Sequence, residues 1–110
     1  KPALTTNIQS SPMSVVVSNL NDQVEIAVSG DFAFPMNREF RDAYRSQPQD
    51  SRFVIDLSRA SYMDSAGLGM LIQLREYAGG DKARITIRGA NEATASVLQI
   101  ANFEKLFDFA

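Results

Sequence analysis

The sequence predicts an α/β domain built on a mixed sheet of four to five strands. Two β-rich segments, residues 14–18 and 24–28, flank a turn and are typical of an antiparallel hairpin. Strand and helix patterns then alternate along the chain, which is typical of parallel strands joined by right-handed crossovers. The 110 residues are enough for one domain with a substantial core.

Composition excludes several classes of function. The chain is 45% hydrophobic and 22% charged, with a formal net charge of −2, as in ordinary globular proteins. It lacks the clustered Lys and Arg of a nucleic-acid surface and the roughly 20-residue apolar run of a membrane span. Without Cys or His it can form no disulfide, no thiolate or imidazole metal site, and no Ser-His-Asp triad. We expect a cytoplasmic protein that uses no cofactor or metal and binds neither nucleic acid nor membrane.

The N-terminal part combines a polar lead, a hairpin and a helix. Residues 1–12 have no hydrophobic period and are predicted to be a flexible lead, with the domain spanning residues 13–110. Residues 24–28 alternate apolar with polar or small side chains, which indicates a half-buried strand. Pro35 suits a helix start, and the helix is expected to end near residues 46–48. Its predicted buried face consists of Met36, Phe40, Ala43 and Tyr44.

The middle of the chain is its most informative part. Residues 53–57, Phe-Val-Ile-Asp-Leu, form the apolar run of a central strand covered on both faces, and residues 58–63 are expected to form a loop. A helix is predicted to begin at Asp64 or Ser65, both good N-cap residues, and to stop at Gly79-Gly80. A serine hydroxyl therefore lies just past the carboxyl end of a strand, where open α/β sheets carry their binding sites.

Two features of this predicted helix leave alternatives open. Its apolar residues sweep roughly 220°, where about 100° is usual, which fits either a docking surface or a helix buried in its own domain. Ser65 is explained by capping alone or by a modifiable hydroxyl facing water. Gly67 and Gly69 either admit a partner's backbone or pack the helix against its own domain. The narrow polar sector consists of Ser65, Gly69, Gln73 and Glu76.

The C-terminal part supplies the remaining elements. Residues 84–88 alternate apolar and polar side chains, which predicts an edge strand or a sheet with one open face. Asn91 is a suitable N-cap for a helix that runs through Ile100. The aromatic residues between 103 and 109 predict a short closing strand or helix whose rings enter the core.

Residues 61–69, Ser-Tyr-Met-Asp-Ser-Ala-Gly-Leu-Gly, follow the Val-Ile-Asp-Leu strand and resemble the signature of STAS domains, specifically bacterial anti-sigma factor antagonists. The similarity extends from about Met13 to the C-terminus. It implies a small mixed sheet with helices packed mainly on one face. Many members of the family continue into a final helix after the segment that here reaches Ala110. In the family, the serine after the aspartate is phosphorylated, and this position is Ser65 here.

The resemblance implies a role in a partner-switching pathway. The chain would bind an anti-sigma factor, often also the serine kinase, while Ser65 is unmodified, and phosphorylation would release it. A metal-dependent serine phosphatase would reverse the modification. The expected partner-binding residues are Asp64, Ser65, Ala66, Gly67, Gly69, Gln73, Asp31 and Phe32.

Two other classes of function are an unregulated binding domain and an enzyme. The alternative is an unregulated STAS-like interaction or scaffold domain in which Ser65 is only a helix cap. An enzyme is disfavoured because the chain has no histidine base and no Gly-x-Ser-x-Gly nucleophile motif, so no catalytic residue is assigned.

Overall fold

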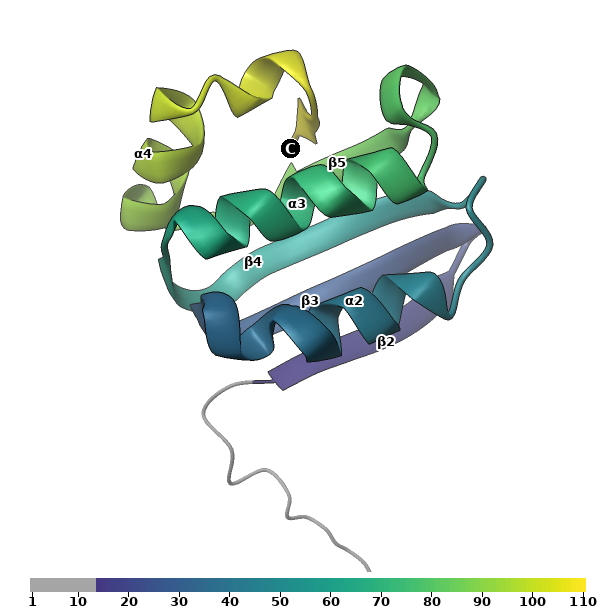
Figure 1. Ribbon diagram of the computed structural model, residues 1–110, viewed down its shortest axis with the longest axis horizontal. Helices are drawn as coiled ribbons and strands as arrows, with labels where there is room; N and C mark the ends of the chain where they lie inside the picture. Colours follow the sequence, from purple (N-terminus) through teal and green to yellow (C-terminus); the bar gives the residue numbers. More distant parts are fainter. Residues whose placement is uncertain (1–13) are drawn as a thin grey trace, which may run out of the picture.

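The computed structural model describes residues 14–110, which form a five-stranded mixed sheet (Figure 1). The predicted lead, residues 1–12, lies outside the described residues. The strands lie in the sheet in chain order, with β2 and β3 antiparallel and the later neighbours parallel. This confirms the predicted α/β class. The strands are β2 (Ser14–Leu20), β3 (Gln23–Phe32), β4 (Arg52–Met63), β5 (Arg84–Arg88) and β6 (Asp108–Phe109).

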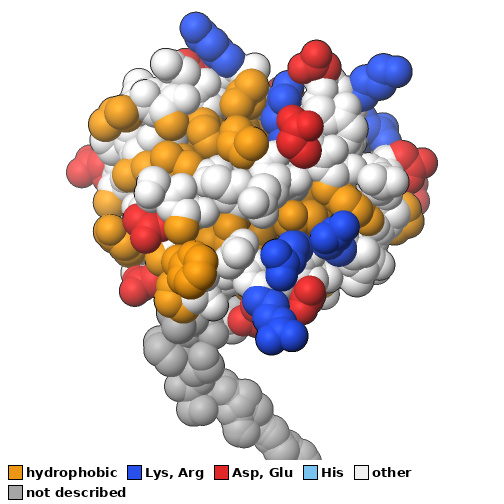
Figure 2. All heavy atoms as spheres, in the orientation of Figure 1, with side chains coloured by type: hydrophobic (Ala, Val, Ile, Leu, Met, Phe, Trp, Pro, Cys, Tyr) orange, Lys and Arg blue, Asp and Glu red, His pale blue; other side chains and the backbone are white. Residues whose placement is uncertain are grey.

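The helices form one layer on one face of the sheet, as expected. From β3 to β6, each new strand is added parallel to the previous one and always at the same edge of the sheet. Right-handed crossovers that all progress in this one direction place their helices on the same face of the sheet. On the surface of this layer, basic side chains gather over α2 (Figure 2). The helices are α2 (Asn37–Arg45), α3 (Ser65–Tyr77) and α4 (Glu92–Ile100), with short 3₁₀ turns η1 (Phe34–Met36), η2 (Gly80–Lys82) and η3 (Phe103–Lys105).

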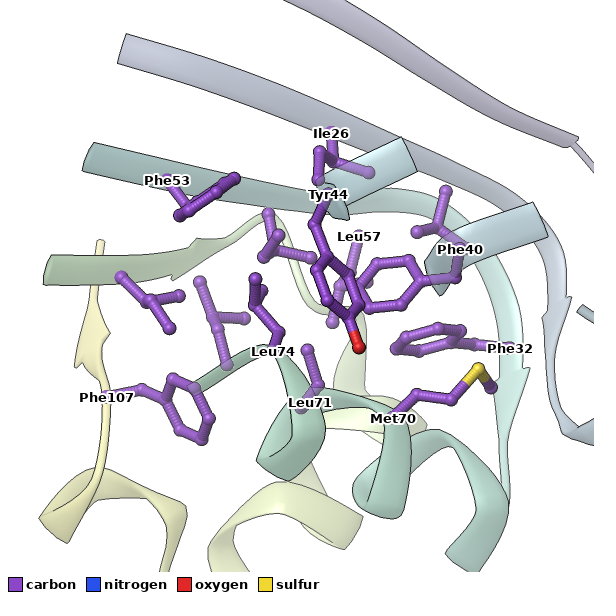
Figure 3. Close-up of a cluster of buried hydrophobic side chains, with 14 of the residues drawn as sticks. Ile26, Phe32, Phe40, Tyr44, Phe53, Leu57, Met70, Leu71, Leu74 and Phe107 are labelled. Carbon is purple, nitrogen blue, oxygen red and sulfur yellow. The ribbon is translucent and has the colours of Figure 1, made fainter. Parts of the chain in front are cut away.

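Aromatic side chains join the sheet to the two central helices (Figure 3). The ring of Phe32, at the end of β3, lies 4.9 Å from the ring of Phe40 on α2, centroid to centroid. Phe40 lies 5.6 Å from Tyr44, and Tyr44 lies 5.3 Å from Tyr77 on α3. Such edge-to-face and tilted pairs add to the burial of apolar area. The predicted inward face is confirmed at Phe40 and Tyr44 on α2 and at Met36 in the preceding η1 turn, all of which are buried.

The segment predicted to be a loop, residues 58–63, instead continues β4 to Met63. It pairs with the second half of β3, which is also longer than predicted, and the register shifts twice along the pair. These irregularities break the two-residue alternation, so the segment lacks a strand pattern in the sequence. They direct Ala60 and Met63 into the core and bring the chain directly to Asp64.

The expectation that residues 53–57 are covered on both faces is wrong. Within residues 14–110 no helix lies on the outer face of the sheet, and this agrees with the open face predicted for β5. Val54 points outward yet is only 5% exposed. A 2.6 Å ion pair joins Arg88 on β5 to Glu25 on β3 and must cross β4, which lies between them. Glu25 is also the register partner of Val54, so the ion pair spans β4 next to this residue.

Asp56 completes the ion cluster on the outer face and gives stability a pH dependence. Burial raises the pKa of Asp56, but hydrogen bonds from Ser58 and the charge of Arg88, 3.6 Å away, outweigh it and lower the pKa overall. Because the pKa of Asp56 is lower in the folded chain than its unfolded-state value of 3.8, the ionised carboxylate stabilises the fold at pH values above 3.8. This contribution is lost as the pH falls through the folded-state pKa.

Asp56→Asn is therefore expected to reduce the free energy of unfolding at pH 7 by up to about 1 kcal/mol, because the carboxylate is 20% exposed and partly screened. The difference from wild type should shrink as the pH drops below 4. Urea unfolding between pH 2.5 and 7 measures it, with the exposed Asp42→Asn as the control variant. A difference that stays constant over this pH range would contradict the assignment.

Candidate functional site

The first turn of α3 is capped by Asp64. Its Oδ1 accepts hydrogen bonds from the backbone N–H groups of Ala66, at 2.9 Å, and Gly67, at 3.2 Å. Asp64 has the extended backbone of an N-cap residue, so the helix begins at Ser65. The explanation of Ser65 as the cap is therefore wrong. Ala66 takes part in the capped turn through its backbone.

Ser65 occupies the first helical position with its hydroxyl free. The side chain is exposed, and no hydrogen bond within residues 14–110 involves its Oγ. Gly69, Gln73 and Glu76 are exposed as well, which confirms the predicted polar sector. A hydroxyl in this position is accessible to a modifying enzyme, and its replacement leaves the cap intact.

The wide apolar arc of α3 is explained by its own domain. Met70, Leu71 and Leu74 are buried in the core, and Leu68 and Ile72 pack half-buried against it. The helix ends at Tyr77, and Gly79 has the positive φ of 115° that suits a glycine after a helix. Of the two explanations of the arc, burial within the domain is the one that the structure supports.

The two glycines of α3 have different surroundings. A Cβ at position 67 would lie 2.5 Å from the backbone oxygen of Phe32 and 2.8 Å from Cγ of Met63. Gly67 therefore packs α3 against the end of β3. A Cβ at Gly69 would meet no atom within 4 Å. Gly69 thus remains a surface position where another chain can approach closely.

The end of β3 and the η1 turn that follows it form a segment beside the first turn of α3. Asp31 is exposed, but Phe32 is completely buried, so the expectation that Phe32 contacts a partner is corrected. Phe34, in the η1 turn, is 72% exposed and is the aromatic that this segment offers at the surface. The close approach of Gly67 to the Phe32 carbonyl brings this segment and α3 together. The sequence alone does not show which of Phe32 and Phe34 is exposed. The structure separates them because Phe32 is the last residue of β3 and Phe34 lies beyond the strand.

The comparisons with known proteins agree with this geometry. Residues 15–108 match the family described as Mlab, STAS domain. The chain is 42% identical to a STAS-domain containing protein of Pseudomonas aeruginosa (strain UCBPP-PA14). The aligned 86 residues cover 77% of this chain and 85% of the relative.

Solved structures with the same fold include three anti-sigma factor antagonists. The protein from Thermotoga maritima has a TM-score of 0.76 at 14% identity, over 86% of this chain and 84% of that one. The protein from Mycobacterium paratuberculosis has a TM-score of 0.74 at 20% identity, over 88% and 84%. SpoIIAA in its unphosphorylated form has a TM-score of 0.70 at 15% identity, over 88% of each chain.

In the described part of this chain, no helix is both long and apolar enough to cross a membrane.

Proposed function

The chain belongs to the STAS domain family, and from this premise we propose that it is an anti-sigma factor antagonist switched by phosphorylation at Ser65. The observation that carries the proposal is the exposed Ser65 hydroxyl, which has no structural role because Asp64 caps the helix. The three antagonists that share the fold support the general role. The unmodified chain binds an anti-sigma factor and thereby frees a sigma factor.

The proposed contact surface surrounds Ser65. It comprises Asp64 at the cap, the backbone of Ala66, and the exposed positions Gly69 and Gln73 along α3. Asp31 lies in the adjacent segment at the same end of the sheet, and Gly67 acts indirectly by holding that segment against α3. A partner that packs here encloses a small neutral hydroxyl.

Phosphorylation disrupts binding without disrupting the fold. A phosphate adds about −1.5 to −2 charges near pH 7. The positive end of the α3 dipole attracts it, whereas the Asp64 carboxylate repels it, so the two effects on the folded chain oppose each other. In the complex the same dianion would be enclosed by the partner and would lose its water. The cost of burying an unpaired charge therefore falls on the interface.

Two enzymes complete the proposed cycle. A serine kinase, which is also the anti-sigma factor, adds the phosphate, and a metal-dependent phosphatase removes it. This role places the chain in the cytoplasm, where sigma factors act, and it requires no catalysis by the chain itself.

The proposal is tested by intact mass and site mapping on the chain isolated from the cells that encode it. We expect one added phosphate, located on Ser65 and removed by the cognate phosphatase. The exposed Ser96 of α4 serves as the internal reference and is expected to stay unmodified. An unmodified Ser65 under every growth condition would refute the switch and leave a constitutive binding domain.

A further inference from the structure

Three arginines lie on one stripe of α2. Arg38, Arg41 and Arg45 are spaced three and four residues apart, which places them on the same side of the helix. Arg38 and Arg45 are exposed and Arg41 is half-buried. The ion pairs within residues 14–110 all involve Arg75 or Arg88, so the α2 arginines are free to pair with another molecule.

A groove separates this stripe from α3. We call it the α2–α3 groove; its volume is about 470 Å³, and its lining residues are Arg41, Tyr44, Arg45, Gln49, Gln73, Glu76 and Tyr77. The packed rings of Tyr44 and Tyr77 join the two helices beneath it. Among the described lining residues, two are basic and one, Glu76, is acidic.

The groove continues the surface around Ser65. Ser65, Gly69 and Gln73 follow one another at four-residue intervals on the exposed side of α3. With a rise of 1.5 Å per residue, Ser65 and Gln73 lie about 12 Å apart along the helix. Gly69, between them, has no side chain, and a Cβ there would meet nothing within 4 Å. A single segment of a partner can therefore run from Ser65 into the groove.

We propose that the α2–α3 groove binds an acidic segment of the anti-sigma factor. This inference rests on the proposed function and adds the chemistry of the partner. Arg41 and Arg45 line one wall with planar guanidinium groups, which pair in bidentate fashion with carboxylates. The exposed Asp42 on α2 and Glu76 on α3 offset two of the three arginine charges, which leaves an excess of one positive charge. A phosphate on Ser65 would carry the same sign as this segment, which reinforces release.

The test reverses charge on the two sides of the groove. We expect Arg41→Glu/Arg45→Glu to weaken binding by about tenfold or more at 50 mM NaCl, mainly through slower association, and to flatten the salt dependence. We expect Glu76→Gln to strengthen binding a few-fold. The control, Arg52→Glu/Arg59→Glu, makes the same charge change at exposed positions of β4 and should bind as wild type does.

The probes are the purified anti-sigma factors cloned from the genome that encodes this chain, measured by surface plasmon resonance at 50 and 300 mM NaCl. If the α2 double variant binds like wild type while Ser65→Asp loses binding, the groove proposal is overturned and the Ser65 switch stands. If the two double variants weaken binding equally, net charge and not the groove is responsible. If the unmodified chain binds none of these proteins, both proposals fail.

Discussion

Replacing Ser65 by aspartate is expected to abolish tight binding to the anti-sigma factor and to leave the fold intact. The variant places an unpaired carboxylate where the partner encloses a neutral hydroxyl, at a cost of about 2 to 5 kcal/mol of binding free energy. This corresponds to at least about a thirtyfold increase in Kd. Ser65→Ala keeps the site small and neutral, so its affinity should stay within a few-fold of wild type.

The stability of the fold is expected to change little on replacement of Ser65 by aspartate or alanine. Asp64 remains the N-cap in both variants, and an acidic side chain in the first turn is favoured by the helix dipole. Thermal unfolding should therefore give the two variants stabilities close to wild type, while isothermal titration calorimetry measures the affinities. Ser96→Asp, at an exposed position of α4, provides the matched control. Equal binding by Ser65→Asp and Ser65→Ala would contradict the switch.

Replacing Gly67 by alanine is expected to cause the largest loss of stability at the site. The new methyl group would lie 2.5 Å from the Phe32 backbone oxygen, which is held by the β3–β4 pairing and cannot rotate away. Overpacking of this kind costs about 1 to 3 kcal/mol. The cost exceeds the gain of about 0.5 to 1 kcal/mol that alanine provides over glycine inside a helix.

Gly69→Ala is the matched control in the same helix. Nothing lies within 4 Å of the added carbon, so only the helix-propensity gain remains, and the variant should be more stable than wild type. Urea unfolding of the three proteins measures the difference. If the two variants change the unfolding midpoint in the same direction, Gly67 does not hold α3 against β3 in the way described.

Local patterns in the sequence predict most of the fold. The hairpin, the order of strands and helices, and the buried face of α2 all follow from apolar spacing and turn residues. The second half of β4 does not, because its register shifts remove the alternation that identifies a strand. The outer face of β4 also escapes the sequence, since the ion pair that spans it joins Glu25 and Arg88, which are distant in the chain.

The site itself could be predicted in part. The sequence locates a hydroxyl at a helix N-terminus, but it leaves Asp64 and Ser65 equivalent as caps, and only the backbone conformation of Asp64 separates them. The sequence likewise does not show that Phe32 is buried while Phe34 is exposed. The basic stripe of α2 resembles an ordinary solvated helix face in the sequence. Only the structure shows that two of these arginines line a groove together with residues of α3.

The most direct test compares two forms of one chain, with serine or phosphoserine incorporated at position 65 during synthesis. Binding of each form to the same purified anti-sigma factor is measured by isothermal titration calorimetry, and circular dichroism confirms that both are folded. We predict one-to-one binding by the serine form and none by the phosphoserine form at the same concentrations. Equal affinity of the two folded forms would contradict the central claim that Ser65 is the switch.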